Sequence, residues 1–177
     1  MTEWEQDKRW SDKFLSEIKR IIGEHIIVES PYEEDAEHNT DLMVLGLNAV
    51  RVACRIRRHG YLKEYGNEFT IRTSRPKGTK TELEKIIEGW GDYILYGFAN
   101  REETFLEKWI LGDLASFRVW FVKSICNNSG IVPGIKKTNT DKSSGFRSFE
   151  YAKIPGFVIA SGGLSKLSQI SVKAPTV

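Results

Sequence analysis

The chain has few cysteines and histidines and no long apolar run, and each shortage excludes a class of protein. It contains two cysteines and three histidines in 177 residues. Cys54 and Cys126 are too few for a cysteine-based zinc site, and the histidines show no strong metal-ligand spacing. We expect both thiols to be buried and reduced. No window approaches about eighteen consecutive apolar residues, which excludes a membrane-spanning helix.

The N-terminal segment also lacks the apolar stretch of a signal peptide. The composition, 40% hydrophobic and 28% charged, is typical of soluble globular proteins rather than disordered ones. The length suits one domain of ordinary size. We therefore expect a cytoplasmic protein with no membrane partner, built as a single α/β domain over residues 1–163 and a flexible tail over residues 164–177.

A net charge of +2 conceals two neighbouring segments of opposite charge. Residues 29–41 carry six carboxylates and no Lys or Arg, whereas residues 51–80 carry nine Lys and Arg and only two Glu. A metal-dependent enzyme that acts on a polyanion needs carboxylates to hold cations and basic groups to hold phosphates. Two solvated faces of opposite sign are the alternative interpretation.

Hydrophobic spacing predicts the order of the secondary-structure elements. The expected elements are a helix that ends at Gly23, strands at 25–30, 41–46, 49–58 and 68–74, a helix from Thr81 to Gly91, a strand at 92–99, a helix capped by Asp113 and a last strand at 156–161. Residues 59–67 and 127–147 are expected to be loops. This order favours an α/β fold, with a mixed central sheet, an αβββαβ core and flanking helices.

The most informative stretch is the expected strand at 49–58, in which arginines alternate with apolar residues. A period of two places Arg51, Arg55 and Arg57 on one face. Because unpaired guanidiniums are costly to bury, we expect this face to lie outside the core. Its outer arginines are six strand steps apart, roughly 20 Å, which suits successive phosphates. Pairing with Glu68 or with the acidic segment is the alternative.

Over roughly residues 3–99 the order of elements resembles the PD-(D/E)XK nuclease superfamily. In that family an Asp opens the second core strand, and an acidic-x-Lys triplet lies on the third. Asp41 occupies the first position, whereas residues 53–55, Ala-Cys-Arg, stand where the triplet is expected. The stretch from Glu68 to Tyr93 also looks similar to proteins of phages and mobile elements.

The resemblance implies a nuclease that depends on Mg²⁺ or Mn²⁺. Asp41 is the expected catalytic acid and metal ligand, Glu29, Asp35 and Glu68 are further candidate ligands, and Lys85 is the candidate for the missing lysine. Such an ion binds oxygen ligands, lowers the pKa of its bound water and neutralises charge on the scissile phosphate. The alternatives are that Asp41 only ends a loop and that Glu29 and Asp35 are solvated surface residues.

DNA, duplex or single-stranded, is the expected partner, and the basic field supplies the candidate contacts. These nucleic-acid-binding residues are Arg51, Arg55, Arg57, Arg72, Arg75, Lys77 and Lys80. Tyr61, Tyr65 and Trp90 are of a type that stacks on bases, although packing within the protein is the commoner role of such side chains.

Two functions of other classes stay open. One is a non-catalytic phage or mobile-element module that inhibits a host nucleic-acid enzyme by protein contact, which fits the missing triplet and the near-neutral charge. The other is an enzyme for a small anionic substrate, although no glycine-rich phosphate loop or nucleophile elbow supports it. A homodimer and a host protein partner are therefore left open beside DNA. Steep weakening of binding by salt distinguishes phosphate recognition from protein contact.

Overall fold

The computed structural model describes residues 3–29, 42–44, 50–75, 80–139 and 144–163. The chain divides into two compact units, Met1–Arg51 and Val52–Val177, and each is described by itself. The single domain expected over residues 1–163 stays a prediction, and the tail expected at 164–177 lies outside the described residues. Among the described helices, none combines the length and the apolar character that crossing a membrane requires.

The first unit contains helices α1 (Glu3–Asp12) and α2 (Leu15–Ile26), followed by strands β1 (Ile27–Glu29) and β2 (Leu42–Val44). The two short strands pair antiparallel, with Glu29 opposite Leu42. The prediction of one helix ending at Gly23 is wrong, because the helix is interrupted before Leu15 and then continues through Gly23. A glycine costs about 1 kcal/mol inside a helix, which weakens the helix without ending it.

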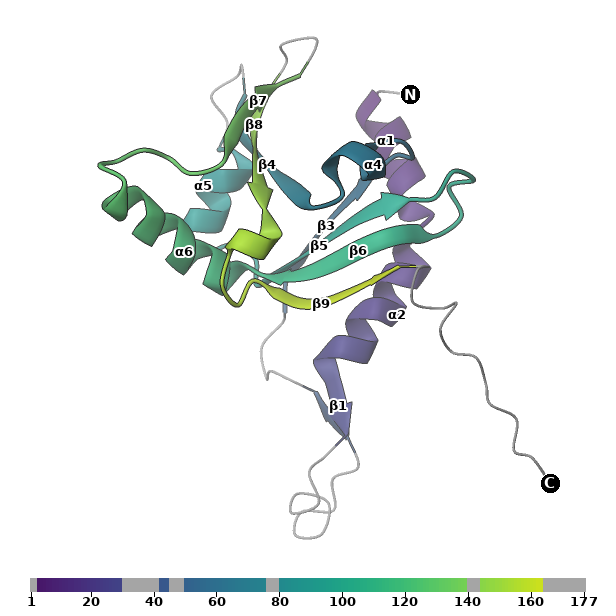
Figure 1. Ribbon diagram of the computed structural model, residues 1–177. Helices are drawn as coiled ribbons and strands as arrows, with labels where there is room; N and C mark the ends of the chain where they lie inside the picture. Colours follow the sequence, from purple (N-terminus) through teal and green to yellow (C-terminus); the bar gives the residue numbers. More distant parts are fainter. Residues whose placement is uncertain (1–2, 30–41, 45–49, 76–79, 140–143, 164–177) are drawn as a thin grey trace, which may run out of the picture. The chain divides into compact units, whose positions relative to one another are not determined.

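The second unit is built on a mixed four-stranded sheet (Figure 1). Its strands are β3 (Val52–Arg57), β5 (Tyr93–Ala99), β6 (Leu106–Asp113) and β9 (Val158–Gly163), in the order β3-β5-β6-β9. β3 runs parallel to β5, while the β5–β6 and β6–β9 pairs are antiparallel. The expected α/β fold class with a mixed sheet is confirmed.

A three-stranded antiparallel sheet forms the second layer of this unit (Figure 1). It consists of β4 (Glu68–Ser74), β8 (Gly145–Glu150) and β7 (Ile135–Thr138), in the order β4-β8-β7. The bounds of β4 match the prediction. The expected loops at 59–67 and 127–147 are partly wrong, because the first contains helix α4 (Tyr61–Tyr65) and the second contains β7 and the start of β8. Three of the four side chains of β7 are exposed, so this strand lacks the alternation by which strands are recognised.

Local capping sets the two remaining α-helices, α5 (Glu82–Ile87) and α6 (Leu114–Asn127). Thr81 and Glu84 form a capping box at the start of α5, where the helix was expected to begin. Asp113 caps α6 by accepting hydrogen bonds from two backbone amides of its first turn, at 3.1 and 2.9 Å. α5 ends at Ile87 rather than near Gly91, because the left-handed Gly89 (φ 96°) turns the chain away first.

The core of the second unit is aromatic and lies where β4 and β8 meet β5, β6 and α6. Phe69 is its centre, since its ring stacks on Phe157 at 4.6 Å between centroids and also contacts Phe117 and Phe149. Phe157 follows the 3-10 helix η1 (Tyr151–Lys153), which connects β8 to β9. This packing holds the two sheets together.

Both cysteines are free and exposed, so the prediction of buried thiols is wrong. Cys54 lies on β3, which is an edge strand in the described sheet, and Cys126 lies in the last turn of α6. An apolar neighbourhood in sequence did not translate into burial, because an edge strand and a helix end both leave side chains in contact with water.

Candidate functional site

The predicted arginine face of β3 is the starting point of the site. Arg55 lies opposite Tyr96 of β5 in the parallel register, and Arg57 lies opposite Phe98. Because Tyr96 and Phe98 belong to the core that packs on β4, the same face of β3 is turned toward β4. Arg55 and Arg57 are half-buried, and the side chain of Arg55 is 27% exposed. The face therefore lies closer to the core than expected.

Hydrogen bonds to β4 and α5 make the burial of Arg55 possible. Its Nη1 donates to the backbone oxygen of Thr70 at 2.9 Å, and its Nη2 donates to Glu82 Oε2 at 2.7 Å. The partner is thus Glu82, whereas Glu68 and the acidic segment were the partners considered from the sequence. Glu82 Oε2 also accepts the backbone N–H of Arg72 at 3.0 Å. One carboxylate oxygen therefore joins β3, β4 and α5.

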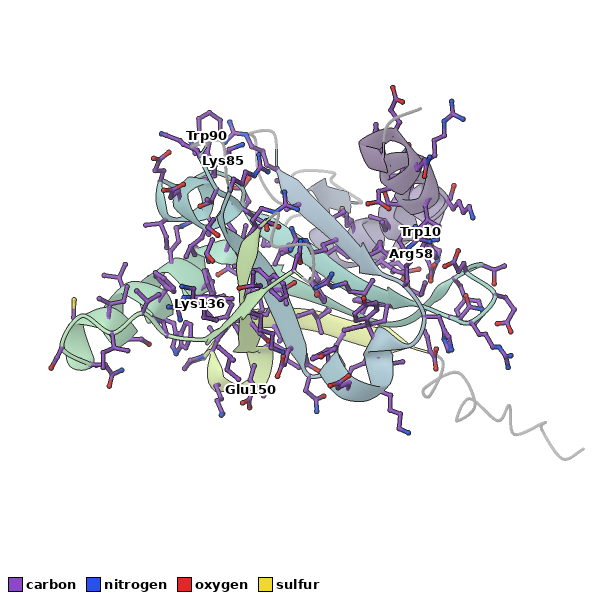
Figure 2. All side chains as sticks on the ribbon, turned by 90° about the horizontal axis from the view of Figure 1, so that it is seen from above. Trp10, Arg58, Lys85, Trp90, Lys136 and Glu150 are labelled. Atoms are coloured by element: carbon purple, nitrogen blue, oxygen red, sulfur yellow. The ribbon has the colours of Figure 1, made fainter. Side chains whose placement is uncertain are left out.

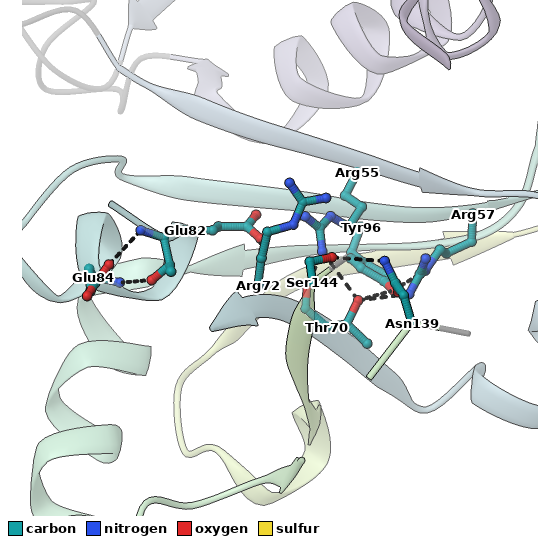
Figure 3. A network of polar contacts seen from close by, with 10 residues as sticks. Arg55, Arg57, Thr70, Arg72, Glu82, Glu84, Tyr96, Asn139 and Ser144 are labelled. Atoms are coloured by element: carbon teal, nitrogen blue, oxygen red, sulfur yellow. Dashed lines mark hydrogen bonds and ion pairs between the residues drawn. The ribbon is translucent and has the colours of Figure 1, made fainter. Parts of the chain in front are cut away.

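Arg57 is held by two buried hydroxyls (Figure 3). Its Nε donates to the hydroxyl of Tyr96 at 2.8 Å, and its Nη2 donates to Thr70 Oγ1 at 3.0 Å. The two hydroxyl oxygens are themselves 3.1 Å apart and share a hydrogen bond. Tyr96 and Thr70 are only 2% and 5% exposed. Buried hydroxyls need hydrogen-bond partners. This arrangement gives partners to both hydroxyls and at the same time fixes the guanidinium of Arg57.

Arg72 adds a third guanidinium beside these two. Its pKa is lowered from the usual range by partial burial and then by the positive charges of Arg55 and Arg75, while the charge of Glu82 opposes this effect. Among the residues that the structure describes, no acceptor is hydrogen-bonded to its guanidinium. We call Arg55, Arg57 and Arg72, with Thr70, Glu82 and Tyr96, the arginine cluster. It contains three cations and one carboxylate.

A second polar cluster lies on the same face of β4. Glu68 pairs with Lys137 of β7 at 3.3 Å and accepts a short hydrogen bond from Ser148 of β8. The Lys137 ammonium also lies 4.3 Å from the centre of the Tyr65 ring, a cation–π geometry. Arg57 makes a contact of the same kind, because its guanidinium carbon lies 5.5 Å from the centre of the Tyr61 ring. The carboxylate of Glu68 is thus bound to other side chains of the protein, those of Lys137 and Ser148.

The other predicted basic residues have separate positions. Arg51 is exposed at the end of the first unit, and Arg75 is exposed just after β4. Lys80 is exposed and pairs with Glu88 at 2.7 Å. Lys77 lies outside the described residues. The structure therefore brings Arg55, Arg57 and Arg72 together, and Arg72 lies near Arg75 as its lowered pKa indicates.

The predicted acids are not brought together in the described part of the chain. Asp41 and Asp35 lie outside it, and of Glu29 only the backbone is described, at the end of β1. Lys85 is exposed on α5, near Trp90, which is 59% exposed (Figure 2). Within the described ranges, no three His, Cys, Asp or Glu side chains form a group that would hold a metal ion. The metal and its ligands stay a prediction.

Sequence reasoning missed the roles of Thr70 and Tyr96. In a strand of period two, Thr70 lies on the same side of β4 as Glu68 and Arg72, which was the signal available. The hydroxyl of Tyr96, by contrast, lies in a strand whose apolar pattern indicates only burial. Its contact with Arg57 joins residues 39 positions apart, so no local pattern reveals it.

Comparison with known proteins found no match for the chain among protein-family models, curated proteins or solved structures.

Proposed function

We propose that the arginine cluster binds the phosphates of a nucleic acid, with DNA as the first substrate to test. The support is an excess of positive charge, since the arginine cluster contains three guanidiniums and one carboxylate, that of Glu82, which pairs with Arg55 and acts on Arg72. A guanidinium presents a planar pair of donors that matches two phosphate oxygens. Partial burial strengthens such a contact, because water screens it less than at an open surface.

The arginines of the cluster have different roles in the proposed phosphate binding. Arg55 and Arg57 donate hydrogen bonds to Thr70, Tyr96 and Glu82, and these bonds hold their positive charges in fixed positions. Arg72, which makes no side-chain hydrogen bond to a described residue, offers its donors to a ligand. Partial burial, followed by repulsion from Arg55 and Arg75, lowers the pKa of Arg72, and a bound phosphate would offset the repulsion. The proposal depends on the observation that no described residue accepts a hydrogen bond from the Arg72 guanidinium.

Salt-dependent binding to labelled oligonucleotides tests the proposal. Fluorescence anisotropy is measured with single-stranded and duplex DNA of about 20 nucleotides or base pairs, a length above the usual site size. Salt is varied from about 50 to 200 mM, a range over which phosphate contacts weaken strongly. We expect Arg72→Ala to weaken binding and to reduce the slope of log K against log[salt] by about 0.7–0.9.

Arg101→Ala is the matched control, because Arg101 is an exposed arginine in the turn between β5 and β6. It should leave the slope unchanged. Arg55→Ala should also flatten the slope, by roughly one unit, together with a loss of stability because Glu82 loses its partner. Equal affinity and equal slope for the Arg72 variant and the wild type would reject the proposal. Repeating the titration with RNA decides between the two nucleic acids.

Cleavage is a separate proposal that the same oligonucleotides test. The wild type and Asp41→Ala are incubated with them in Mg²⁺ or Mn²⁺ and the products are separated by electrophoresis. We expect cutting by the wild type alone if Asp41 holds the ion. Equal cutting by both proteins removes Asp41 from the site, and no cutting by either leaves a protein that binds without catalysis.

A further inference from the structure

Trp120 lines two hollows in the surface of the second unit. The smaller, of about 340 Å³, is lined by Glu68, Trp120, Gly134, Ile135, Ser148, Phe149, Glu150 and Lys153. The larger, of about 560 Å³, is lined by Ala115, Ser116, Val119, Trp120, Lys123, Ser124, Asn127 and Pro155. We call these residues together the Trp120 groove. None of them belongs to the arginine cluster.

The larger hollow of the groove runs along one face of α6. The larger hollow follows α6 from Ala115 to Asn127, and twelve steps of a helix span about 18 Å. An extended chain advances about 3.3 Å per residue, so five or six residues of a peptide would cover this length. The smaller hollow, which Trp120 also lines, has the volume of a pocket for one large side chain or a small ligand. These dimensions favour a peptide over a compact small molecule.

The lining of the groove combines a fixed aromatic ring with exposed apolar side chains. The ring of Trp120 lies 5.9 Å from that of Phe117 and 6.1 Å from that of Phe149, between centroids, so the core holds it in place. Val119 and Ile135 are 54% and 57% exposed. Rigid aromatic side chains with exposed apolar neighbours are typical of protein–protein contact sites.

The charges of the groove identify a complementary feature of the occupant. In the smaller hollow the carboxylates are already neutralised, because Glu68 pairs with Lys137 and Glu150 pairs with Lys153 at 2.8 Å. In the larger hollow Lys123 is the only charged lining residue, and it has no ion pair with any described residue. A single unneutralised ammonium beside apolar side chains complements one carboxylate flanked by apolar groups. A nucleic acid would need several cations along its path.

We propose that the Trp120 groove binds an extended segment of a partner protein that carries a large apolar side chain and an acidic residue. The apolar side chain enters the smaller hollow beside Trp120, and the carboxylate pairs with Lys123. The proposal does not rest on nucleic-acid binding, because the groove and the arginine cluster share no residue.

Synthetic peptides and the full chain test the proposal. Fluorescein-labelled peptides of about eight residues carry one Leu, Phe or Trp and one Asp at varied spacing, and a second set carries Lys in place of Asp. Binding is measured by anisotropy and by the NMR signal of the Trp120 indole N–H, assigned with Trp120→Phe. We expect saturable binding of Asp peptides with a Kd below about 1 mM and a shift of the Trp120 signal.

Two variants sharpen this result. Lys123→Glu should weaken the Asp peptides about fivefold and strengthen the Lys peptides, since an exposed ion pair contributes up to about 1 kcal/mol. Val119→Asp should weaken both sets. Lys63→Glu, which changes an exposed lysine on α4, is the control and should leave binding unchanged. Circular dichroism establishes that each variant is folded.

Three results would overturn the proposal. The first is the absence of saturable binding by every peptide of the sets, and the second is binding that Lys123→Glu and Val119→Asp leave unchanged. The third is a concentration-dependent dimer, seen by light scattering, that Val119→Asp dissociates, because the groove would then be occupied by a second copy of the chain. None of these results affects the salt dependence expected for Arg72→Ala.

Discussion

One side of β4 carries Phe69 and Ile71, and the other carries Glu68, Thr70 and Arg72. The first two are fully buried in the aromatic core, and Thr70 is also buried, at 5% exposure. Both sides of the strand are therefore covered by the chain, one by rings and the other by hydrogen-bonded polar groups. β4 therefore lies between an apolar layer of packed rings and a layer of hydrogen-bonded polar groups.

The difference lies in how each interior responds to change. Apolar packing is non-directional and scales with the area removed from water, so its loss is large but spread over many contacts. The polar side depends on single atoms, such as Glu82 Oε2, which accepts from two donors, and the hydroxyl of Tyr96, which is hydrogen-bonded to both Arg57 and Thr70. We therefore expect the apolar side to determine stability and the polar side to determine the proposed binding of an anion.

The largest effect is expected from Phe69→Ala. Removing a ring that contacts Phe117, Phe149 and Phe157 leaves a cavity in the core, and such substitutions cost about 3–5 kcal/mol. Urea denaturation followed by circular dichroism measures the free energy of unfolding. Ile135→Ala, at an exposed position of β7, is the control and should change stability by less than about 0.5 kcal/mol. Similar losses for both would mean that Phe69 is not the centre of the core.

Glu82→Gln should have the next largest effect. Its carboxylate is half-buried and accepts from Arg55 and from the backbone of Arg72, so losing the charge should cost about 1–2 kcal/mol. Glu88→Gln changes the exposed pair with Lys80 and should cost less than about 1 kcal/mol.

The same variant also tests the anion site. Without Glu82 the three guanidiniums have no carboxylate among their described partners, so a polyanion should replace the missing charge. We expect Glu82→Gln to bind oligonucleotides more tightly than the wild type at low salt and to regain stability when they are added. If oligonucleotides stabilise the variant and the wild type equally, the arginine cluster is not where they bind.

The two sides of β4 also show how far sequence patterns extend. Alternation is local, so it predicted the bounds of β4. It did not predict that the polar side is covered too, because that depends on Arg55 and Glu82, which are 27 residues apart. Pairing lowered the cost of burial that had placed the arginine face outside the core.

The prediction missed β7 and α4 because neither shows a local pattern. β7 has no apolar alternation because its side chains are mostly exposed, and α4 is too short to show a helical period. Of the candidate metal ligands Asp41, Asp35, Glu29 and Glu68, only Glu68 has a described side chain, and it pairs with Lys137. The family resemblance rested on the order of elements, and that order is compatible with many functions, so the nuclease activity stays a prediction.

A smaller effect is expected from Tyr96→Phe. The substitution keeps the ring in the core and removes only the hydroxyl that accepts from Arg57 and is hydrogen-bonded to Thr70. A lost hydrogen bond of this kind costs about 1 kcal/mol. Tyr93→Phe is the control on the same strand and should be neutral. A double-mutant cycle with Thr70→Val should give a coupling energy of at least about 0.5 kcal/mol, and additive losses would show that the hydroxyls act independently.

The smallest effect is expected at the capping box of α5, which holds Glu82 in place. Hydrogen bonds from the backbone and side chain of Thr81 lower the pKa of Glu84 below its ordinary value of 4.5. A carboxyl whose pKa is lower in the folded state stabilises the fold above pH 4.5, and this contribution is lost as the pH falls through the folded-state value. Glu84→Gln should therefore lower the Tm at neutral pH by less than Tyr96→Phe does. The difference from the wild type should shrink below pH 4.5. Glu88→Gln removes a carboxylate outside the box and serves as the control, and a pH-independent difference for Glu84→Gln would show that the cap does not depend on its charge.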